Sequence, residues 1–215
     1  MFMENTFEIE FEGVYGKYKI TQEDKKEVRN YRLALLICGI SFTAGMCQWL
    51  LIGDSFAWVW LIPMCISLGL ALKWIHIYVQ VLHRTLQFLW AIGTLGIFSI
   101  ILKGNSQDLI SNLVSRPILI LIIGPYFAAM AGLGFKEFFC FQRPEAIGVT
   151  LLLPISLGSH LMGALPQEIE MIFLYLAAVL FLILAMRKFG MDAASDIGDK
   201  SVFQYLRSKN ETAKT

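Results

Sequence analysis

Five polar residues recur at helical spacing between two apolar runs of the sequence. They are separated by three, four, three and four positions, and they include two of the chain's three histidines: Lys73, His76, Gln80, His83 and Gln87. On a continuous helix this spacing places the five side chains on one face. Because polar groups are costly inside so apolar a chain, this stripe is the best candidate for a binding site.

Two more cations extend the stripe into a predicted polar cluster at a membrane boundary. Besides the histidines, the cluster consists of Lys73, Gln80, Arg84, Gln87 and Lys136. A cluster of this kind can bind an anionic headgroup, a pigment or a metal ion. The alternative is that these long side chains lie at helix ends and extend toward the interface without binding a ligand.

A metal site would need a third ligand besides His76 and His83. Glu137 is the candidate, since it follows an apolar run and is predicted to lie at the same membrane face. A carboxylate with two imidazoles is a common ligand set for iron or zinc. The competing interpretation is a charge network in which Glu137 pairs with Lys136 or Arg143 and closes a helix end.

His160 lies inside a predicted membrane span, a few residues before its far end. An unpaired imidazole at that depth is costly, so a hydrogen bond to a neighbouring helix is expected. The ring could instead bind a chlorophyll or haem, which makes His76, His83 and His160 the three candidate cofactor ligands. A proton relay is a further alternative, but the sequence shows no buried carboxylate beside His160.

The composition indicates a membrane protein. Of the 215 residues, 56% are hydrophobic and 16% are charged, whereas soluble domains carry roughly 25% charged residues. Membrane lipid is therefore an expected partner. The net charge of +1 argues against binding to nucleic acid. The four cysteines form no CxxC pair and are expected to be buried, and the polar N-terminal region does not resemble a cleavable secretory signal.

Six apolar runs have the length that a bilayer requires, roughly 20 residues each. The predicted spans are residues 33–52, 56–79, 85–102, 118–135, 146–165 and 169–186. The turn between the second and third spans is predicted near residues 79–84, although neither Gly nor Pro marks it. The stretch 103–117 is expected to lie in the interface. Gly124, Ala128 and Gly132 form a small-residue stripe that favours close helix packing.

Charge predicts the orientation of these spans. Sixteen of the eighteen Lys and Arg residues fall on the side that holds both termini, the 2–3 loop and the 4–5 loop. By the positive-inside rule, that side faces the cytoplasm or its equivalent. The predicted organisation is an N-terminal cytoplasmic segment of residues 1–32, a transmembrane domain of residues 33–186 and a cytoplasmic tail of residues 187–215.

The N-terminal segment alternates apolar and charged residues, which is the period of a strand. A hairpin with a four-residue loop, 13–16, would pair Glu12 with Lys17, Glu10 with Lys19, Phe11 with Tyr18 and Ile9 with Ile20. A disordered acidic tail is the alternative. Thr21 is a predicted N-cap, followed by acidic residues in the first turn of a helix that continues into the first span.

Four segments resemble a family of uncharacterised integral membrane proteins of cyanobacteria and plastids. They are GKYKITQEDKK, WIHIY with the following LHRTLQ, FKEFFCF and HLMGALP, in this order between Gly16 and Pro166. Where the family has a proline before the LHR segment, this chain has Gln80 and Val81. The resemblance implies a thylakoid or cytoplasmic membrane and photosynthetic-membrane partners. It implies no activity and no catalytic residue.

The sequence therefore predicts an all-α membrane protein of six transmembrane helices with a small N-terminal β-hairpin. The expected function is that of a non-enzymatic assembly, scaffold or auxiliary factor of a photosynthetic membrane complex, in contact with pigment or lipid. A transporter of small solutes or ions is one alternative, and an intramembrane metal-dependent enzyme is another. GxSxG, HExxH, P-loop and GxGxxG motifs are absent from the sequence, which lends an enzymatic function no support.

Overall fold

Six long apolar helices dominate the computed structural model, which describes residues 10–77, 79–103, 109–202 and 205. They are α1 (Gln22–Leu51), α2 (Leu61–Trp74), α3 (Gln80–Lys103), α5 (Ile120–Phe141), α6 (Pro144–Met162) and α7 (Gln167–Lys188). The short 3₁₀ helices η1 (Ala57–Trp60) and η3 (Pro117–Leu119) precede α2 and α5. Each of the six, with its 3₁₀ extension where present, is long and apolar enough to cross a membrane. The predicted fold class is confirmed.

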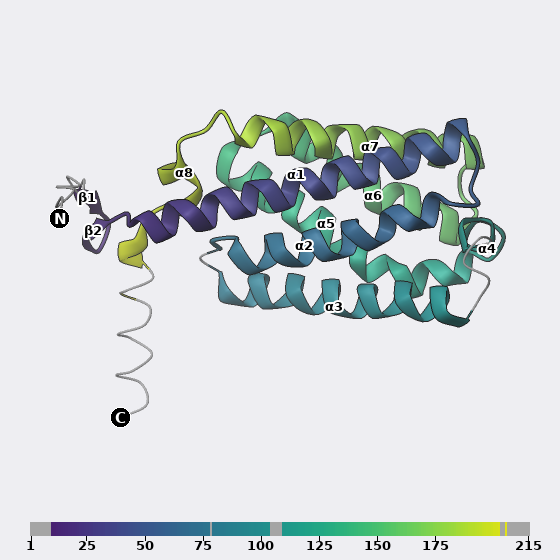
Figure 1. Ribbon diagram of the computed structural model, residues 1–215, viewed down its shortest axis with the longest axis horizontal. Coiled ribbons are helices and arrows are strands. Elements are labelled where there is room, and N and C mark those ends of the chain that lie inside the picture. The colour runs from purple at the N-terminus through teal and green to yellow at the C-terminus, as the bar shows by residue number, and fades with distance from the viewer. Residues whose placement is uncertain (1–9, 78, 104–108, 203–204, 206–215) are drawn as a thin grey trace, which may run out of the picture.

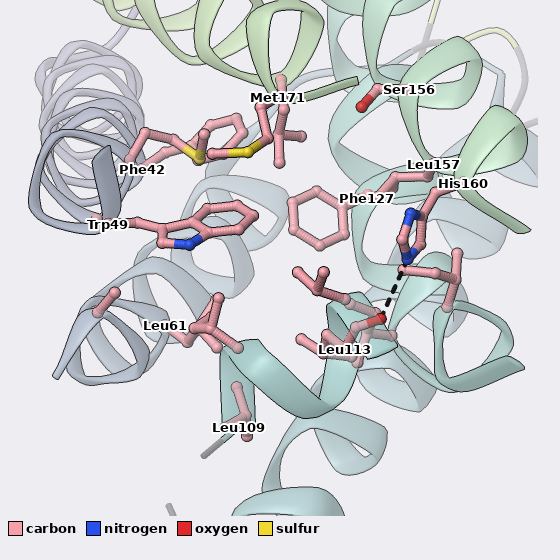
Figure 2. Close-up of a pocket in the computed structure, with 18 of the residues that line it drawn as sticks. Phe42, Trp49, Leu61, Leu109, Leu113, Phe127, Ser156, Leu157, His160 and Met171 are labelled. Carbon is pink, nitrogen blue, oxygen red and sulfur yellow. Dashed lines mark hydrogen bonds between the residues drawn. The ribbon is translucent and has the colours of Figure 1, made fainter. Parts of the chain in front are cut away.

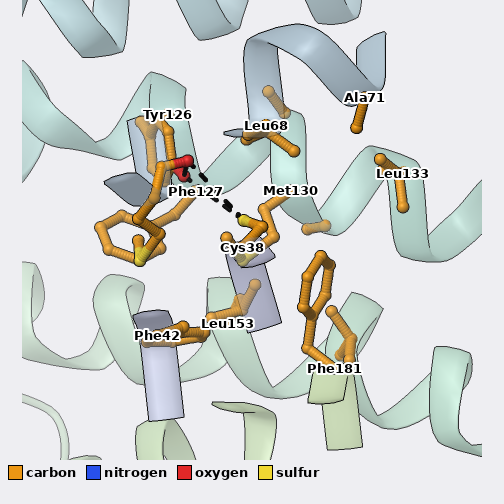
Figure 3. Packing of buried hydrophobic residues seen from close by; sticks show 14 of the residues in the cluster. Cys38, Phe42, Leu68, Ala71, Tyr126, Phe127, Met130, Leu133, Leu153 and Phe181 are labelled. Atoms are coloured by element: carbon orange, nitrogen blue, oxygen red, sulfur yellow. Dashed lines mark hydrogen bonds between the residues drawn. The ribbon is translucent and has the colours of Figure 1, made fainter. Parts of the chain in front are cut away.

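The six helices run side by side along the long axis of the molecule (Figure 1). Contacts join α1 to α2, α2 to α3, α3 to α5, α5 to α6, α6 to α7 and α7 back to α1. The helices therefore close a ring, and their inward faces form one hydrophobic core. Figure 3 shows α5 side chains packed against Cys38 and Phe42 of α1, Leu68 of α2 and Phe181 of α7. Within this core the Tyr126 hydroxyl donates to the Met64 carbonyl at 2.8 Å.

Helices α3 and α5 approach each other closely at two glycines that the sequence analysis did not single out. A Cβ added at Gly93 would collide with the backbone of Tyr126, and one at Gly96 would collide with the carbonyl of Ile122. In the predicted stripe, Gly132 does face the side chain of Leu86, but Gly124 meets nothing closer than its own helix neighbour at 4.0 Å. Glycines on α3 thus bring the two helices together.

The hairpin forms with the predicted register. Strands β1 (Glu10–Gly13) and β2 (Gly16–Lys19) pair Glu10 with Lys19, Phe11 with Tyr18 and Glu12 with Lys17. The Phe11 and Tyr18 rings stack at 5.6 Å between centroids. The prediction of a four-residue loop was wrong, because Gly13 pairs with Gly16 and leaves only residues 14 and 15 in the turn. The predicted Ile9–Ile20 pair lies outside the described residues.

Helix α1 begins at the predicted cap and continues unbroken for 30 residues. The Thr21 hydroxyl accepts from the Asp24 amide at 3.2 Å, and the Asp24 carboxylate accepts from the Thr21 amide at 2.7 Å. This reciprocal arrangement is a capping box, which satisfies two backbone donors at the helix start. The polar lead-in and the first span are therefore one helix.

The hairpin and the C-terminal segment meet at the same end of the bundle (Figure 1). The short helix α8 (Ala193–Ile197) precedes a stretch in which Asp199 accepts from the Val14 amide at 2.7 Å and Ser201 from the Tyr15 amide at 3.0 Å. The rings of Tyr15 and Tyr205 stack at 4.2 Å. The short helix α4 (Leu109–Ser115) lies at the opposite end.

Candidate functional site

The predicted polar stripe is divided at the link between α2 and α3. Helix α2 ends at Trp74 and α3 begins at Gln80, so the turn comes before the predicted residues 79–84. His83 and Gln87, from the first two turns of α3, bond the Leu72 carbonyl at 2.7 and 3.2 Å. Because α2 ends two residues later, this carbonyl belongs to its open last turn. Both side chains thus close the end of a helix.

The remaining members of the predicted polar cluster lie apart. Lys73, Gln80 and Arg84 are exposed at the ends of α2 and α3, and the Lys73 ammonium lies 5.9 Å from the Trp74 ring. This arrangement is typical of cations that extend from helix ends. Lys136, by contrast, is buried inside the bundle.

His76 lies in the link and turns toward the start of α1. Its Nε2 is 3.5 Å from the Glu27 carboxylate. With Asp24, these residues form the one group of potential metal ligands found in the described part of the chain, with ligand atoms within 4.8 Å of one another. Lys200 already bonds the Asp24 carboxylate at 2.7 Å. Burial, assisted by the charges of Lys136 and Lys200, lowers the pKa of His76 against the opposing effect of Glu27 and Asp24.

Glu137 is fully buried in a network of charges under the same end of the bundle. It accepts from the Tyr31 hydroxyl at 2.7 Å, from Lys136 at 2.9 Å and from Lys188 at 2.8 Å. The predicted pairing of Glu137 with Lys136 is present, and Lys188 of α7 is its second cation in place of Arg143. The Glu137 carboxylate thus accepts hydrogen bonds from two ammonium groups and one hydroxyl group.

The structure does not bring His76, His83 and Glu137 together as a ligand set. The link directs His76 outward to α1, whereas the first turn of α3 directs His83 to the end of α2. Glu137 lies deeper and is held by lysines. The three side chains that the sequence analysis combined therefore belong to three different local structures.

A pocket lies at the opposite end of the ring, around His160 (Figure 2). It encloses about 130 Å³ and is contacted by all six long helices together with η1 and α4. Its walls are mainly aromatic, aliphatic and thioether side chains, among them Phe42, Met46, Trp49, Trp60, Leu61, Met64, Ile97, Leu109, Ile123, Phe127, Leu157, Met171 and Leu174. Ser156, His160, Gln167 and Glu170 supply the polar groups.

His160 forms hydrogen bonds through both ring nitrogens. Its Nδ1 is 2.8 Å from Glu170 Oε2 on α7, and its Nε2 is 3.2 Å from the Leu113 carbonyl on α4. The expectation that no buried carboxylate accompanies His160 was wrong, because Glu170 is buried in the first turn of α7. A signal was present in the sequence: the two residues flank the Gly163–Pro166 turn, where antiparallel helices face each other.

The hydrogen bonds of His160 join three helices at the pocket. The Nδ1 atom on α6 meets the carboxylate of Glu170 on α7, and Nε2 meets the carbonyl of Leu113 on α4. The tautomer of the ring sets which of the two nitrogens donates. The pocket wall thus contains an imidazole–carboxylate pair whose second ring nitrogen faces a backbone carbonyl.

Proline explains why the Leu113 carbonyl depends on His160. In a helix this carbonyl would accept from the amide four residues later, and that residue is Pro117, which has no N–H. The neighbouring Asn112 carbonyl receives its bond from the Arg116 amide at 3.0 Å. His160 thus supplies the donor that Pro117 lacks and ties the last turn of α4 to α6.

The fold and its six long apolar helices define a multi-pass membrane protein. A family model described as uncharacterized integral membrane protein (DUF2301) matches residues 70–205. This match spans more than half of the chain, so the protein belongs to that family of integral membrane proteins. The matched region contains His160 and Glu170 of the pocket as well as Glu137 and Lys188. No curated protein and no solved structure matches the chain.

Proposed function

We propose that this protein is a non-enzymatic auxiliary factor of a membrane complex, and that it binds an uncharged apolar molecule in the interior pocket. The observation that carries the proposal is the pocket itself, an apolar space with the His160–Glu170 pair in its wall. Ligand sites are typically of this kind, with apolar walls and a few polar groups that orient the ligand.

The chemistry of the pocket favours a lipid-like ligand over chlorophyll. A cavity of about 130 Å³ accommodates a ring or part of an acyl chain, but it is too small for a pigment macrocycle. Lipid contact therefore has more support than the pigment contact that the sequence also suggested.

The setting we propose is a photosynthetic membrane, either a thylakoid or a cytoplasmic membrane. The resemblance of GKYKITQEDKK, WIHIY and HLMGALP to cyanobacterial and plastid proteins supports it. A scaffold or assembly factor in that setting should co-purify with a large complex in mild detergent. A monomer that migrates without partners on a native gel would contradict the auxiliary role.

We further propose that the hairpin end of the bundle faces the cytoplasm or stroma. The charge bias supports this orientation, since Lys and Arg concentrate at that end. Single cysteines at Val14 and at Ser115, both exposed and at opposite ends, would test it in a variant that lacks the native cysteines. In sealed right-side-out vesicles, an impermeant maleimide should label position 115 and spare position 14. The reverse pattern would invert the topology.

Ligand binding can be tested with one substitution and one matched control. Leu157→Trp places a larger side chain in the pocket wall, whereas Leu151→Trp places it on the exposed side of the same helix. Lipids that co-purify with the wild type and with Leu151→Trp should be lost from Leu157→Trp, as measured by mass spectrometry. Identical lipid content in all three proteins would contradict the proposed site.

The His160–Glu170 pair also favours a second function, proton-coupled transport of a small solute. Imidazole and carboxylate groups inside membrane spans are the groups that relay protons in such transporters. Transport requires water to reach the pocket from both sides of the membrane in turn. A cysteine at Ser156 should then react with a small charged thiol reagent from either side, and protection from both sides would exclude this function.

A further inference from the structure

We infer that the pocket recognises a ring carbonyl, and that its ligand is an uncharged quinone-type molecule whose carbonyl accepts from His160 Nε2. This inference rests on the proposed function and specifies its ligand class. In the structure, the backbone carbonyl of Leu113 occupies the acceptor position that the ligand's carbonyl would take.

His160 Nε2 can exchange the Leu113 carbonyl for a ligand oxygen. His160 Nδ1 is held at 2.8 Å by Glu170, whereas Nε2 meets the Leu113 carbonyl at 3.2 Å, the long end of the range for such bonds. Glu170 fixes the ring, and the hydrogen on Nε2 therefore points in a constant direction. A ligand oxygen at that position would gain a shorter bond from a ring that is already oriented.

The internal acceptor is weakly anchored. Helix α4 has seven residues, too few to be stable as an isolated helix. Besides His160, it is held by the buried side chain of Leu109 and by a hydrogen bond from Ser111 to Asp54. Leu113 is only partly buried where it packs against the core, and a ligand oxygen would take the place of its carbonyl when the last turn of α4 shifts.

The walls of the pocket favour a ligand with a planar, uncharged ring. Aromatic rings of Phe42, Trp49, Trp60 and Phe127 line the space, and such rings favour stacking with another ring. The volume of about 130 Å³ is comparable to cavities that hold one benzene-sized ring, so a longer tail would extend beyond it. Because neither Lys nor Arg is among the lining residues, a carboxylate or phosphate head would meet no permanent counter-charge.

Two molecules of the same shape separate the carbonyl contribution from apolar burial. Duroquinone and durene are both tetramethylated six-membered rings, but only duroquinone carries carbonyl groups. Equilibrium dialysis against the purified full chain in detergent should give duroquinone a higher affinity than durene, by less than the roughly 5- to 10-fold value of one full hydrogen bond, because the new bond replaces the one to Leu113. His160→Phe should abolish this difference and leave durene binding in place.

Two further variants keep the test informative if His160→Phe does not fold. Glu170→Gln retains a hydrogen-bond partner at Nδ1 and a hydrogen on Nε2, so the preference for duroquinone should persist. Pro117→Ala restores an amide at position 117, which can donate to the Leu113 carbonyl once Arg116 becomes helical, and the new bond would free His160 Nε2. That variant should bind duroquinone more tightly than the wild type, with durene affinity unchanged.

The outcomes distinguish the two proposals. Equal binding of duroquinone and durene, with both lost in Leu157→Trp, would retain the pocket and overturn the ring-carbonyl inference. A preference for methyl laurate that depends on His160 would assign the site to acyl carbonyls and also overturn it. Failure of every probe to bind, or binding that Leu157→Trp does not change, would overturn the proposed function itself.

Discussion

Lys188 of α7 bonds Glu137 of α5 and Asp196 of α8 at the same time, inside the hairpin end of the bundle. The ammonium group lies 2.8 Å from Glu137 Oε2, and its second bond is to Asp196 Oδ1. Arg32 of α1 reaches the same Asp196 carboxylate and also bonds the carbonyls of residues 191 and 192. One charge network thereby joins α1, α5, α7 and α8.

Replacement of Lys188 by Met should destabilise the protein by about 3–5 kcal/mol. The substitution removes two charge-assisted hydrogen bonds, each worth about 1.5–3 kcal/mol, from the buried carboxylates Glu137 and Asp196, which keep Lys136 and Arg32 as partners. Unfolding in mixed SDS and mild-detergent micelles would measure the loss. Lys103→Met, at an exposed helix end, is the matched control and should change stability little.

The double variant Glu137→Leu/Lys188→Met tests whether the two residues act as a pair. Its loss of stability should be clearly smaller than the sum of the two single losses, because each single loss already includes the contact between Glu137 and Lys188. Additive effects would show that the contact contributes nothing beyond the two separate side chains.

Loss of the His160 ring should loosen α4. In His160→Phe the Leu113 carbonyl has no donor, since Pro117 cannot provide one, at a cost of about 1–3 kcal/mol. Hydrogen exchange of residues 109–115 should speed up by one to two orders of magnitude, while exchange in α5 stays as in the wild type. Adding Pro117→Ala should restore much of the protection, and no restoration would refute this account of the α4 end.

Hydropathy and local alternation were sufficient to predict the architecture. Apolar runs of bilayer length identify the six spans, and the alternation around Glu10–Lys19 and Phe11–Tyr18 identifies the hairpin register, because both signals are local. The N-cap at Thr21 was predictable for the same reason, because its partner Asp24 is only three residues away. The hairpin loop was the exception, since pairing of Gly13 with Gly16 depends on how tightly the strands close.

The candidate sites depended on contacts that local patterns do not contain. Lys188 follows Glu137 by 51 residues, and only the packing of α7 on α5 makes it a better partner than Arg143. His76 and His83 separate because the α2–α3 link occurs before residue 80, without a glycine or proline to mark it. The short turn between α6 and α7 was the usable signal for His160 and Glu170, because His160 lies three residues before Gly163 and Glu170 four residues after Pro166.

Gly93→Ala should destabilise the contact between α3 and α5. The added methyl group would collide with the backbone of Tyr126, which cannot move aside as a flexible side chain can, at a cost of about 2 kcal/mol. Gly158→Ala is the matched control, because a Cβ there meets nothing within 4 Å and alanine favours helix. In thermal unfolding in detergent, the midpoint temperature should fall for Gly93→Ala and stay near the wild-type value for Gly158→Ala. Equal midpoint temperatures in the two variants would contradict the close approach.

Acidification should destabilise the protein through His76. Its pKa is lowered in the folded state, mainly by burial, so the unfolded chain binds the proton more readily. The contribution of His76 to stability is therefore complete above its unfolded pKa, about 6.5, and is lost as the pH falls toward the folded value. The charged groups that act on it are Glu27 and Asp24, which oppose the shift, and Lys136 and Lys200, which add to it.

The His76→Gln variant isolates this effect from the titration of the carboxylates. Stability of the wild type relative to the variant should fall between pH 7.5 and pH 5, by at most about 1.4 kcal/mol per pH unit for one proton. Denaturant unfolding at closely spaced pH values would measure the difference. A wild type that gains stability over the variant on acidification would mean that Glu27 and Asp24 outweigh burial, and that His76 is charged in the folded protein.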